Sequence, residues 1–167
     1  MTVEMTNIIL LSAYFLTLFA VGEIAYRYFH VNAEITRKWS HIGSGLLALL
    51  FPAYLHSLGW VASICALFLV ILYVSKPLGL LPSIHQVKRQ TYGSLLFPVA
   101  VFLSFWSFQT KGNDLVFFYL PVLTLAVCDL AAALLGQKYP LRKIQIYAAS
   151  KSWGGLLAFL ISSLILN

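Results

Sequence analysis

Long, uninterrupted apolar blocks are the feature that most restricts the fold of this 167-residue chain. A hydrocarbon core about 30 Å thick is crossed by roughly 20 helical residues, and backbone groups in lipid must find partners within the protein, which favours helices. Membrane-spanning strands would instead alternate apolar with polar residues. With 60% hydrophobic and 10% charged residues, the sequence predicts one polytopic, all-α membrane domain over residues 1–167. About six transmembrane helices are expected, at residues 7–28, 42–56, 59–75, 93–109, 115–136 and 151–166.

The basic residues predict how these helices are oriented. Every lysine and arginine except Lys111 falls in the connections that follow the first, third and fifth predicted helices, or at the ends of those connections. By the positive-inside rule these connections face the cytoplasm, and both termini lie on the non-cytoplasmic side. A bacterial cytoplasmic membrane fits this size and topology. Membrane proteins without catalytic function show the same bias, so it predicts topology alone.

Three predicted helices begin at this basic face, and their first turns combine basic, hydroxyl and glycine residues. A helix start presents unpaired amides and the positive end of the helix dipole, which suits an anion. Glycine lets a phosphate approach the backbone, while lysine and arginine neutralise its charge. Each start alone is an ordinary structural feature, but three together indicate a polyphosphate ligand. The candidate contacts are Arg37, Lys38, His41, Lys88, Arg89, Gly93, Lys151, Ser152 and Gly155.

Asp129 is an acid within the fifth apolar block. It shares a helix face with Gly136, about two turns or roughly 10 Å away at the predicted cytoplasmic end. A charge at that depth costs a few kcal/mol if it faces lipid, so we expect Asp129 to face inward. An intramembrane acid indicates a functional site, with a structural ion pair to a lysine as the alternative.

Phosphoryl transfer gives these acids a role. Magnesium bridges phosphate oxygens in such reactions and is commonly held by one or two carboxylates. Asp129 is the best candidate to hold magnesium or to orient an attacking hydroxyl. Glu23 is the candidate second ligand, although an internal pair with Arg27, one turn away, is its alternative.

A face of small residues is also predicted on the last helix. Lys151, Gly154, Gly155 and Ala158 recur there at the spacing of one helical face. Close packing against another helix is the favoured reading of such a face when it is considered by itself.

Four segments resemble the dolichol kinase, phytol kinase and farnesol kinase family, over roughly residues 20–160 and in the family's order. Residues 33–41, Ala-Glu-Ile-Thr-Arg-Lys-Trp-Ser-His, resemble its E-[IL]-[ST]-R-K-x-x-H segment, and Tyr92-Gly93 resembles the entry to its middle helix. Residues 129–136 are similar to its D-x-x-A-x-x-x-G segment, and residues 151–155 to its K-[ST]-x-x-G segment.

The resemblance implies an integral-membrane, magnesium-dependent kinase that transfers the terminal phosphate of a nucleotide, often CTP, to the hydroxyl of a polyprenol, phytol or diacylglycerol. Asp129 and Lys151 are the expected catalytic residues, and Asp129 and Glu23 the expected magnesium ligands. A membrane lipid and a nucleotide are the expected partners, with no nucleic acid. The expected phosphate-binding residues are Arg37, Lys38, His41, Lys88, Arg89, Tyr92, Gly93, Gly136, Lys138, Ser152 and Gly155.

Other functions fit parts of the same pattern. A phosphatidate cytidylyltransferase would use a similar site, whereas a transporter would place its decisive charges near the midplane, often in two related halves. A structural membrane subunit is the simplest alternative. Family members commonly continue into a further span with an Asp-Asn pair that is missing before Asn167. We therefore expect a compact version, a site completed by a second copy, or an inactive scaffold.

Overall fold

The fold is mainly helical, because a long apolar run satisfies its backbone N–H and C=O groups internally when it forms a helix. The structure is a computed structural model that describes residues 3–86, 93–139, 141–146 and 149–166. Its elements are α1 (Val3–Tyr28), α2 (Ala33–Ala48), α3 (Phe51–Tyr54), α4 (Leu58–Ser75), α5 (Pro82–His85), α6 (Gly93–Thr110), α7 (Val116–Leu123), the π-helical turn η1 (Thr124–Cys128), α8 (Asp129–Lys138), β1 (Lys143–Ile146), β2 (Ala149–Ser152) and α9 (Trp153–Leu166).

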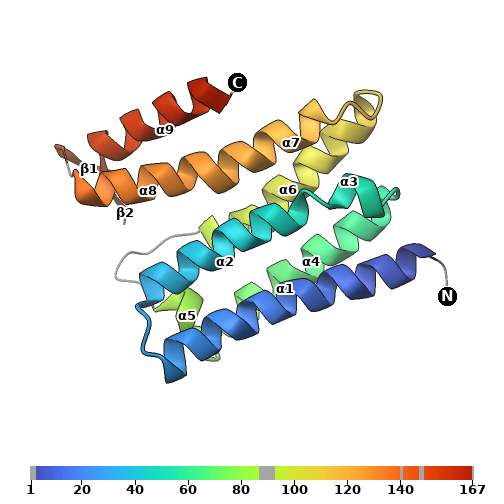
Figure 1. Cartoon of the computed structure of the whole chain (residues 1–167), viewed down its shortest axis with the longest axis horizontal. Helices are drawn as coiled ribbons and strands as arrows, with labels where there is room; N and C mark the ends of the chain where they lie inside the picture. Colours follow the sequence, from blue (N-terminus) through green and yellow to red (C-terminus); the bar gives the residue numbers. More distant parts are fainter. Residues whose placement is uncertain (1–2, 87–92, 140, 147–148, 167) are drawn as a thin grey trace.

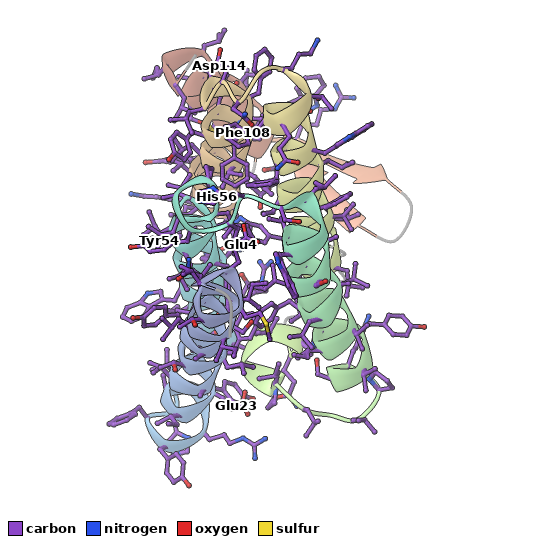
Figure 2. The ribbon with its side chains drawn as sticks, turned by 90° about the vertical axis from the view of Figure 1, so that its right-hand side faces the viewer. Glu4, Glu23, Tyr54, His56, Phe108 and Asp114 are labelled. Atoms are coloured by element: carbon purple, nitrogen blue, oxygen red, sulfur yellow. The ribbon has the colours of Figure 1, made fainter. Side chains whose placement is uncertain are left out.

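Successive long helices run in opposite directions, so the two termini lie at the same end of the molecule (Figure 1). The α1–α2 turn, α5 and the β1–β2 hairpin lie at the other end (Figure 1). Figure 2 views the end that carries the termini, where Glu4, His56 and Asp114 are found. The backbone N–H of His56 donates to a carboxylate oxygen of Glu4 at 3.1 Å, which ties α1 to the turn before α4.

Four helices of the described chain are long and apolar enough to cross a membrane. They are α1, α4, α6 and the continuous helix formed by α7, η1 and α8 at Val116–Lys138. Helix α9 is apolar but has 14 residues, and α2 has 16. The prediction of an apolar, mainly helical chain is therefore confirmed, whereas six membrane passes and the orientation of the termini stay predictions.

The second helix begins nine residues earlier than predicted, at Ala33 rather than at residue 42. The side chain of Asn32 accepts a hydrogen bond from the backbone N–H of Glu34 at 2.9 Å, which caps the helix start. This start could not be located from the apolar run, because the first turns of α2 are amphipathic. Arg37, Lys38 and His41 consequently lie within α2, and the prediction that they form a helix start is wrong.

The chain before the last helix is a hairpin. Strands β1 and β2 pair antiparallel, with Ile144 opposite Lys151, and α9 begins at Trp153. Lys151 is therefore a strand residue, and the prediction that it heads a helical face with Gly154 is wrong. The Trp153 N–H donates to the Leu141 carbonyl at 3.1 Å, so the strand ends where the hairpin turns into α9.

Candidate functional site

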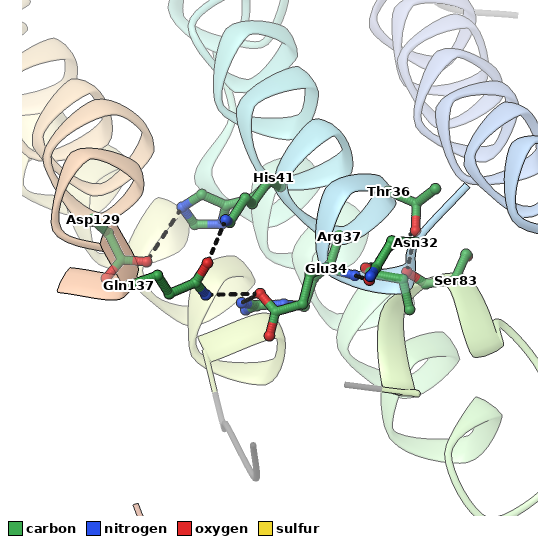
Figure 3. Close-up of polar contacts among 10 residues, drawn as sticks. Asn32, Glu34, Thr36, Arg37, His41, Ser83, Asp129 and Gln137 are labelled. Atoms are coloured by element: carbon green, nitrogen blue, oxygen red, sulfur yellow. Dashed lines mark hydrogen bonds and ion pairs between the residues drawn. The ribbon is translucent and has the colours of Figure 1, made fainter. Parts of the chain in front are cut away.

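Helix α2 meets the continuous α7–η1–α8 helix at a histidine. His41 Nε2 lies 2.9 Å from the carbonyl oxygen of Leu125 in η1 and 3.8 Å from Oδ2 of Asp129, the first residue of α8. Figure 3 shows the imidazole directed at the Asp129 carboxylate. Because a carbonyl can only accept, Nε2 carries a hydrogen in this geometry, and Nδ1 is the nitrogen left to accept in the neutral ring.

A glycine contact lets the two helices come this close. A Cβ atom on Gly45 would lie 2.5 Å from the Cβ of Ala126, which is closer than real Cβ atoms approach. Gly45 is one helical turn from His41, and Ala126 follows Leu125 in the π-helical turn. The absence of a side chain at Gly45 therefore sets the distance at which His41 reaches η1.

Asp129 faces the neighbouring helix α2 rather than a lysine. Its side chain is 55% exposed, and it lines a cavity together with Arg37, His41 and Ser94. Within the described residues, the ionisable group that it approaches is His41, at 3.8 Å. The carboxylate is thus an accessible acid on an inward-facing side, which leaves an oxygen open to a ligand.

A row of polar contacts continues from this point along α2 and α8. Lys38 Nζ donates to Gln137 Oε1 at 3.1 Å, and Gln137 Nε2 donates to Glu34 Oε2 at 3.1 Å. The same Glu34 oxygen lies 3.7 Å from an Nη atom of Arg37 (Figure 3). Two of these residues were not among the predicted site residues. Both are sequence neighbours of predicted site residues: Glu34 is the first residue of the Glu-Ile-Thr-Arg-Lys segment, and Gln137 follows Gly136.

Arg37 has an unmet hydrogen-bonding group at this site. Its Nε is buried and has no acceptor among the described residues, although its guanidinium lines the cavity. A buried donor without a partner is costly, so an anion or a hydroxyl at this position would satisfy it.

Glu23, the predicted second magnesium ligand, has partners of its own. One carboxylate oxygen pairs with Arg27 Nε, and the other accepts from the backbone N–H of Ser83 in α5 at 3.2 Å. This is the internal pair that the sequence left as the alternative. In the described part of the chain, no group of three or more His, Cys, Asp or Glu side chains gathers as a metal site. Magnesium could therefore be held by Asp129 with phosphate oxygens and water, as Mg²⁺ commonly is, whereas Glu23 does not fit.

Three predicted phosphate contacts are used to pack α8 against the hairpin and α9. The Ser152 hydroxyl donates to the Gly136 carbonyl at 3.1 Å and accepts from the Gly155 N–H at 3.2 Å. A Cβ on Gly155 would lie 2.9 Å from the Ala132 carbonyl oxygen. The structure thus shows close helix packing for Gly136, Ser152 and Gly155, and their contact with phosphate stays a prediction.

Gly93, Lys138 and Lys151 are the remaining predicted site residues that the structure describes. Gly93 begins α6 and lines the cavity, and Lys138 ends α8 with its Nζ 5.5 Å from the ring centre of Tyr139. Lys151 is described only as a backbone position in β2. The predicted residues Lys88, Arg89 and Tyr92 lie outside the described residues.

Two hollows adjoin the polar row. One is the cavity beside Asp129, with a volume of about 80 Å³, which has room for several water molecules. The other is a wider, polar hollow where the end of α1, the start of α2 and the end of α8 meet. It is lined by Tyr26, Arg27, His30, Val31, Asn32, Ala33, Glu34, Gln86 and Gln137. Glu34 and Gln137 therefore belong both to the polar row and to this second hollow.

Comparison with known proteins identifies one curated relative. The chain is 34% identical over 136 residues to a protein named phytol kinase from Synechocystis sp., an alignment that covers 81% of this chain and 58% of the relative. The chain thus spans somewhat more than half the length of that relative. No protein-family model and no solved structure matches the chain.

Proposed function

We propose that this chain is an integral-membrane lipid-alcohol kinase, because it is 34% identical over 136 residues to a protein named phytol kinase. It transfers the terminal phosphate of a nucleotide, with CTP as the proposed donor, to the hydroxyl of an isoprenoid alcohol or a related lipid. The observation that carries the proposal is the meeting of His41, Asp129 and Arg37 at the polar end of a cavity whose deeper walls are apolar. An acceptor with a hydroxyl and a hydrocarbon chain would contact the polar end with the hydroxyl and the apolar walls with the chain.

Electrostatics supports the transfer of a phosphoryl group at this position. In such reactions the protein contributes positioning and charge stabilisation more than covalent chemistry. Arg37 and Lys38 supply positive charge on one turn of α2, and the unpartnered Nε–H of Arg37 offers a directed donor. These two residues would hold the transferred phosphate beside the acceptor hydroxyl.

Asp129 and His41 would act on the acceptor itself. A carboxylate that accepts the hydroxyl proton or orients the hydroxyl is a recurring part of kinases. The exposed Asp129 carboxylate can accept a hydrogen bond from a hydroxyl in the cavity. His41 bonds to Leu125 and faces Asp129, so its proposed role is to position the carboxylate.

A bound magnesium ion would neutralise charge on the nucleotide phosphates. Asp129 is the residue that would hold it, because its side chain is exposed toward the polar end of the cavity. The polar hollow beside Glu34 and Gln137 would receive the nucleoside, since it adjoins Lys38 through the Gln137 bridge. The distribution of basic residues supports placing this end at the cytoplasmic face of a bacterial membrane, where nucleotides are found.

The test is phosphate transfer by the full chain in lipid micelles. We would supply magnesium, each nucleotide labelled in its terminal phosphate, and a panel of phytol, geranylgeraniol, a long polyprenol and diacylglycerol. Label in the organic phase with one alcohol, absent in the Asp129→Asn variant, is the expected result. Release of pyrophosphate with a nucleotidyl lipid as product would indicate a cytidylyltransferase instead. Absence of label with every pair, from protein shown to be folded, would contradict the kinase proposal for this chain alone.

A further inference from the structure

The cavity beside Asp129 follows one face of α2. The wall residues Arg37, His41, Ser44 and Ala48 recur at helical spacing along it. From the first to the last of them the helix rises about 16 Å. The cavity is therefore elongated along the helix, as a site for an extended chain must be.

The walls change from polar to apolar along this length. Arg37, His41 and Asp129 stand at one end, beside the start of α6. The other end is lined by Phe51 of α3 and Ile64 of α4. Since apolar surface favours apolar ligands and polar groups fix orientation, the cavity has a defined direction for a molecule with one polar end.

An aromatic cluster closes the apolar end. The ring of Phe15 lies 6.1 Å from that of Phe51, at 69° between the ring planes, and 5.0 Å from that of Phe68. Phe51 is 2% exposed, and Ala48, which lines the cavity in front of it, has no exposed surface. The rings are closely packed, as side chains in protein interiors are, so the cluster forms the floor of the cavity.

We propose that this cavity holds the lipid alcohol as a single hydrocarbon chain, and that the floor of Phe15, Phe51 and Phe68 limits the length of chain the protein accepts. The hydroxyl lies beside His41 and Asp129, and the chain extends along α2 toward Phe51. The inference rests on the proposed kinase function for the identity of the polar group. The cavity has a volume of about 80 Å³, which is smaller than a chain of the length of phytol, so the side chains along its walls must move apart when the chain enters.

Chain orientation can be tested without turnover. A prenol of about the length of phytol, with a photoreactive diazirine at the end remote from its hydroxyl, would be bound to the full chain in micelles and irradiated. Attachment to residues of α3 and of α4 around Ile64 and Phe68, mapped by mass spectrometry and reduced by unlabelled phytol, is the expected result. Attachment confined to outward-facing residues such as Leu67 and Val70, which are 46% and 55% exposed, would overturn the proposal.

Chain length can be tested with variants of the floor. Ala48→Leu should lower kcat/KM for a C20 alcohol relative to a C15 alcohol by about tenfold, because it fills the space in front of Phe51. Phe51→Ala should shift the ratio toward the longer alcohol. Phe108→Ala is the matched control, since Phe108 is a buried phenylalanine that packs on Phe105 and Phe118 and does not line the cavity.

The experiments can contradict the cavity proposal and the kinase proposal independently of each other. Unchanged length preference in both Ala48→Leu and Phe51→Ala, in protein that still transfers phosphate, would overturn the floor and leave the kinase function standing. Attachment of the diazirine probe at the floor in protein that phosphorylates no alcohol would support the cavity inference and remove the kinase function.

Discussion

His41 on α2 approaches Asp129 on α8 with its Nε2 3.8 Å from Oδ2, while the same nitrogen lies 2.9 Å from the Leu125 carbonyl oxygen. The imidazole is thus fixed by the backbone of η1 and presented to the carboxylate by that bond. This arrangement joins two sequence segments that each resemble part of a kinase motif, and it locates the proposed reaction at the polar end of the cavity.

Asp129→Asn should lower phosphate transfer at least about a hundredfold, because the amide cannot act as a base or hold a cation as a carboxylate does. The melting temperature should change little, since the Asp129 side chain is 55% exposed. Label transfer and thermal unfolding in micelles would measure both. Asp114→Asn is the matched control, because Asp114 caps the start of α7 at the opposite end (Figure 2). Equal activity in the two variants would remove Asp129 from the reaction.

His41→Phe should lower both activity and stability. It keeps an aromatic ring against Phe97, whose centre lies 5.2 Å away, but leaves the Leu125 carbonyl without this donor, at a cost of about 1 kcal/mol. His41→Gln can still donate to that carbonyl and should recover most of the stability but not the activity. Thermal unfolding and transfer rates would separate the two effects. Wild-type unfolding in His41→Phe would show that the bond to Leu125 contributes nothing.

Gly45→Ala should separate α2 from η1, because its new Cβ would meet Ala126 at 2.5 Å. We expect a loss of about 1–3 kcal/mol in unfolding free energy, with lower transfer activity because His41 moves away from Asp129. Gly59→Ala is the control, since a Cβ there would lie 3.6 Å from the Ser57 hydroxyl, which is ordinary contact. If Gly45→Ala and Gly59→Ala unfolded at the same temperature, the close approach would not constrain the helices.

Lys38 and Gln137 should be coupled in nucleotide binding. Lys38→Met should raise the nucleotide KM several-fold by removing a charge near the phosphates. Gln137→Leu should also raise it, because it releases the lysine and removes a polar group from the hollow proposed for the nucleoside. In the double variant the effects should be non-additive by about 0.5 kcal/mol or more, as expected for residues in contact. Initial rates over a nucleotide series would give the four KM values. Strict additivity would show that the bridge does not position Lys38.

His85 should make stability depend on pH at the α5 end. Burial lowers the pKa of His85 from its usual 6.5, and the nearby charge of Lys76 lowers it further. A lowered pKa in the folded protein means that the unfolded chain binds the proton more tightly. The stabilisation is complete above the usual pKa and is lost as the pH falls below 6.5 toward the lowered value.

The matching variant is His85→Gln, which can still bond to the Ser75 hydroxyl that His85 Nε2 contacts at 2.8 Å. The melting temperature should drop more in the wild type than in the variant between about pH 7.5 and about pH 5.5. Unfolding scans at both pH values would measure the difference. Parallel drops in the two proteins would show that His85 does not titrate in this range.

Local composition was enough to predict the long apolar helices. In lipid, a continuous apolar run satisfies its backbone groups by forming a helix. The helices α1, α4, α6 and Val116–Lys138 could therefore be located from residue type alone. The prediction that Asp129 faces inward rested on the same kind of argument, since a carboxylate facing lipid is costly; in the structure its side chain approaches His41 of α2 and is 55% exposed. The short, amphipathic start of α2 could not be predicted in this way, because its cap at Asn32 is a local hydrogen bond and not an apolar pattern.

Contacts between distant segments were decided only by the tertiary structure. Neither the bond from His41 to Leu125 nor the Gln137 bridge between Lys38 and Glu34 has a signature in its own segment. The hydroxyl of Ser152 was likewise assigned to phosphate from its neighbours in sequence, whereas it bonds to the Gly136 carbonyl. Sequence determined which groups are too polar to face lipid, because that preference belongs to each residue. Which partner each group meets depends on how the helices pack, because close approach at Gly45 and Gly155 sets the distances between them.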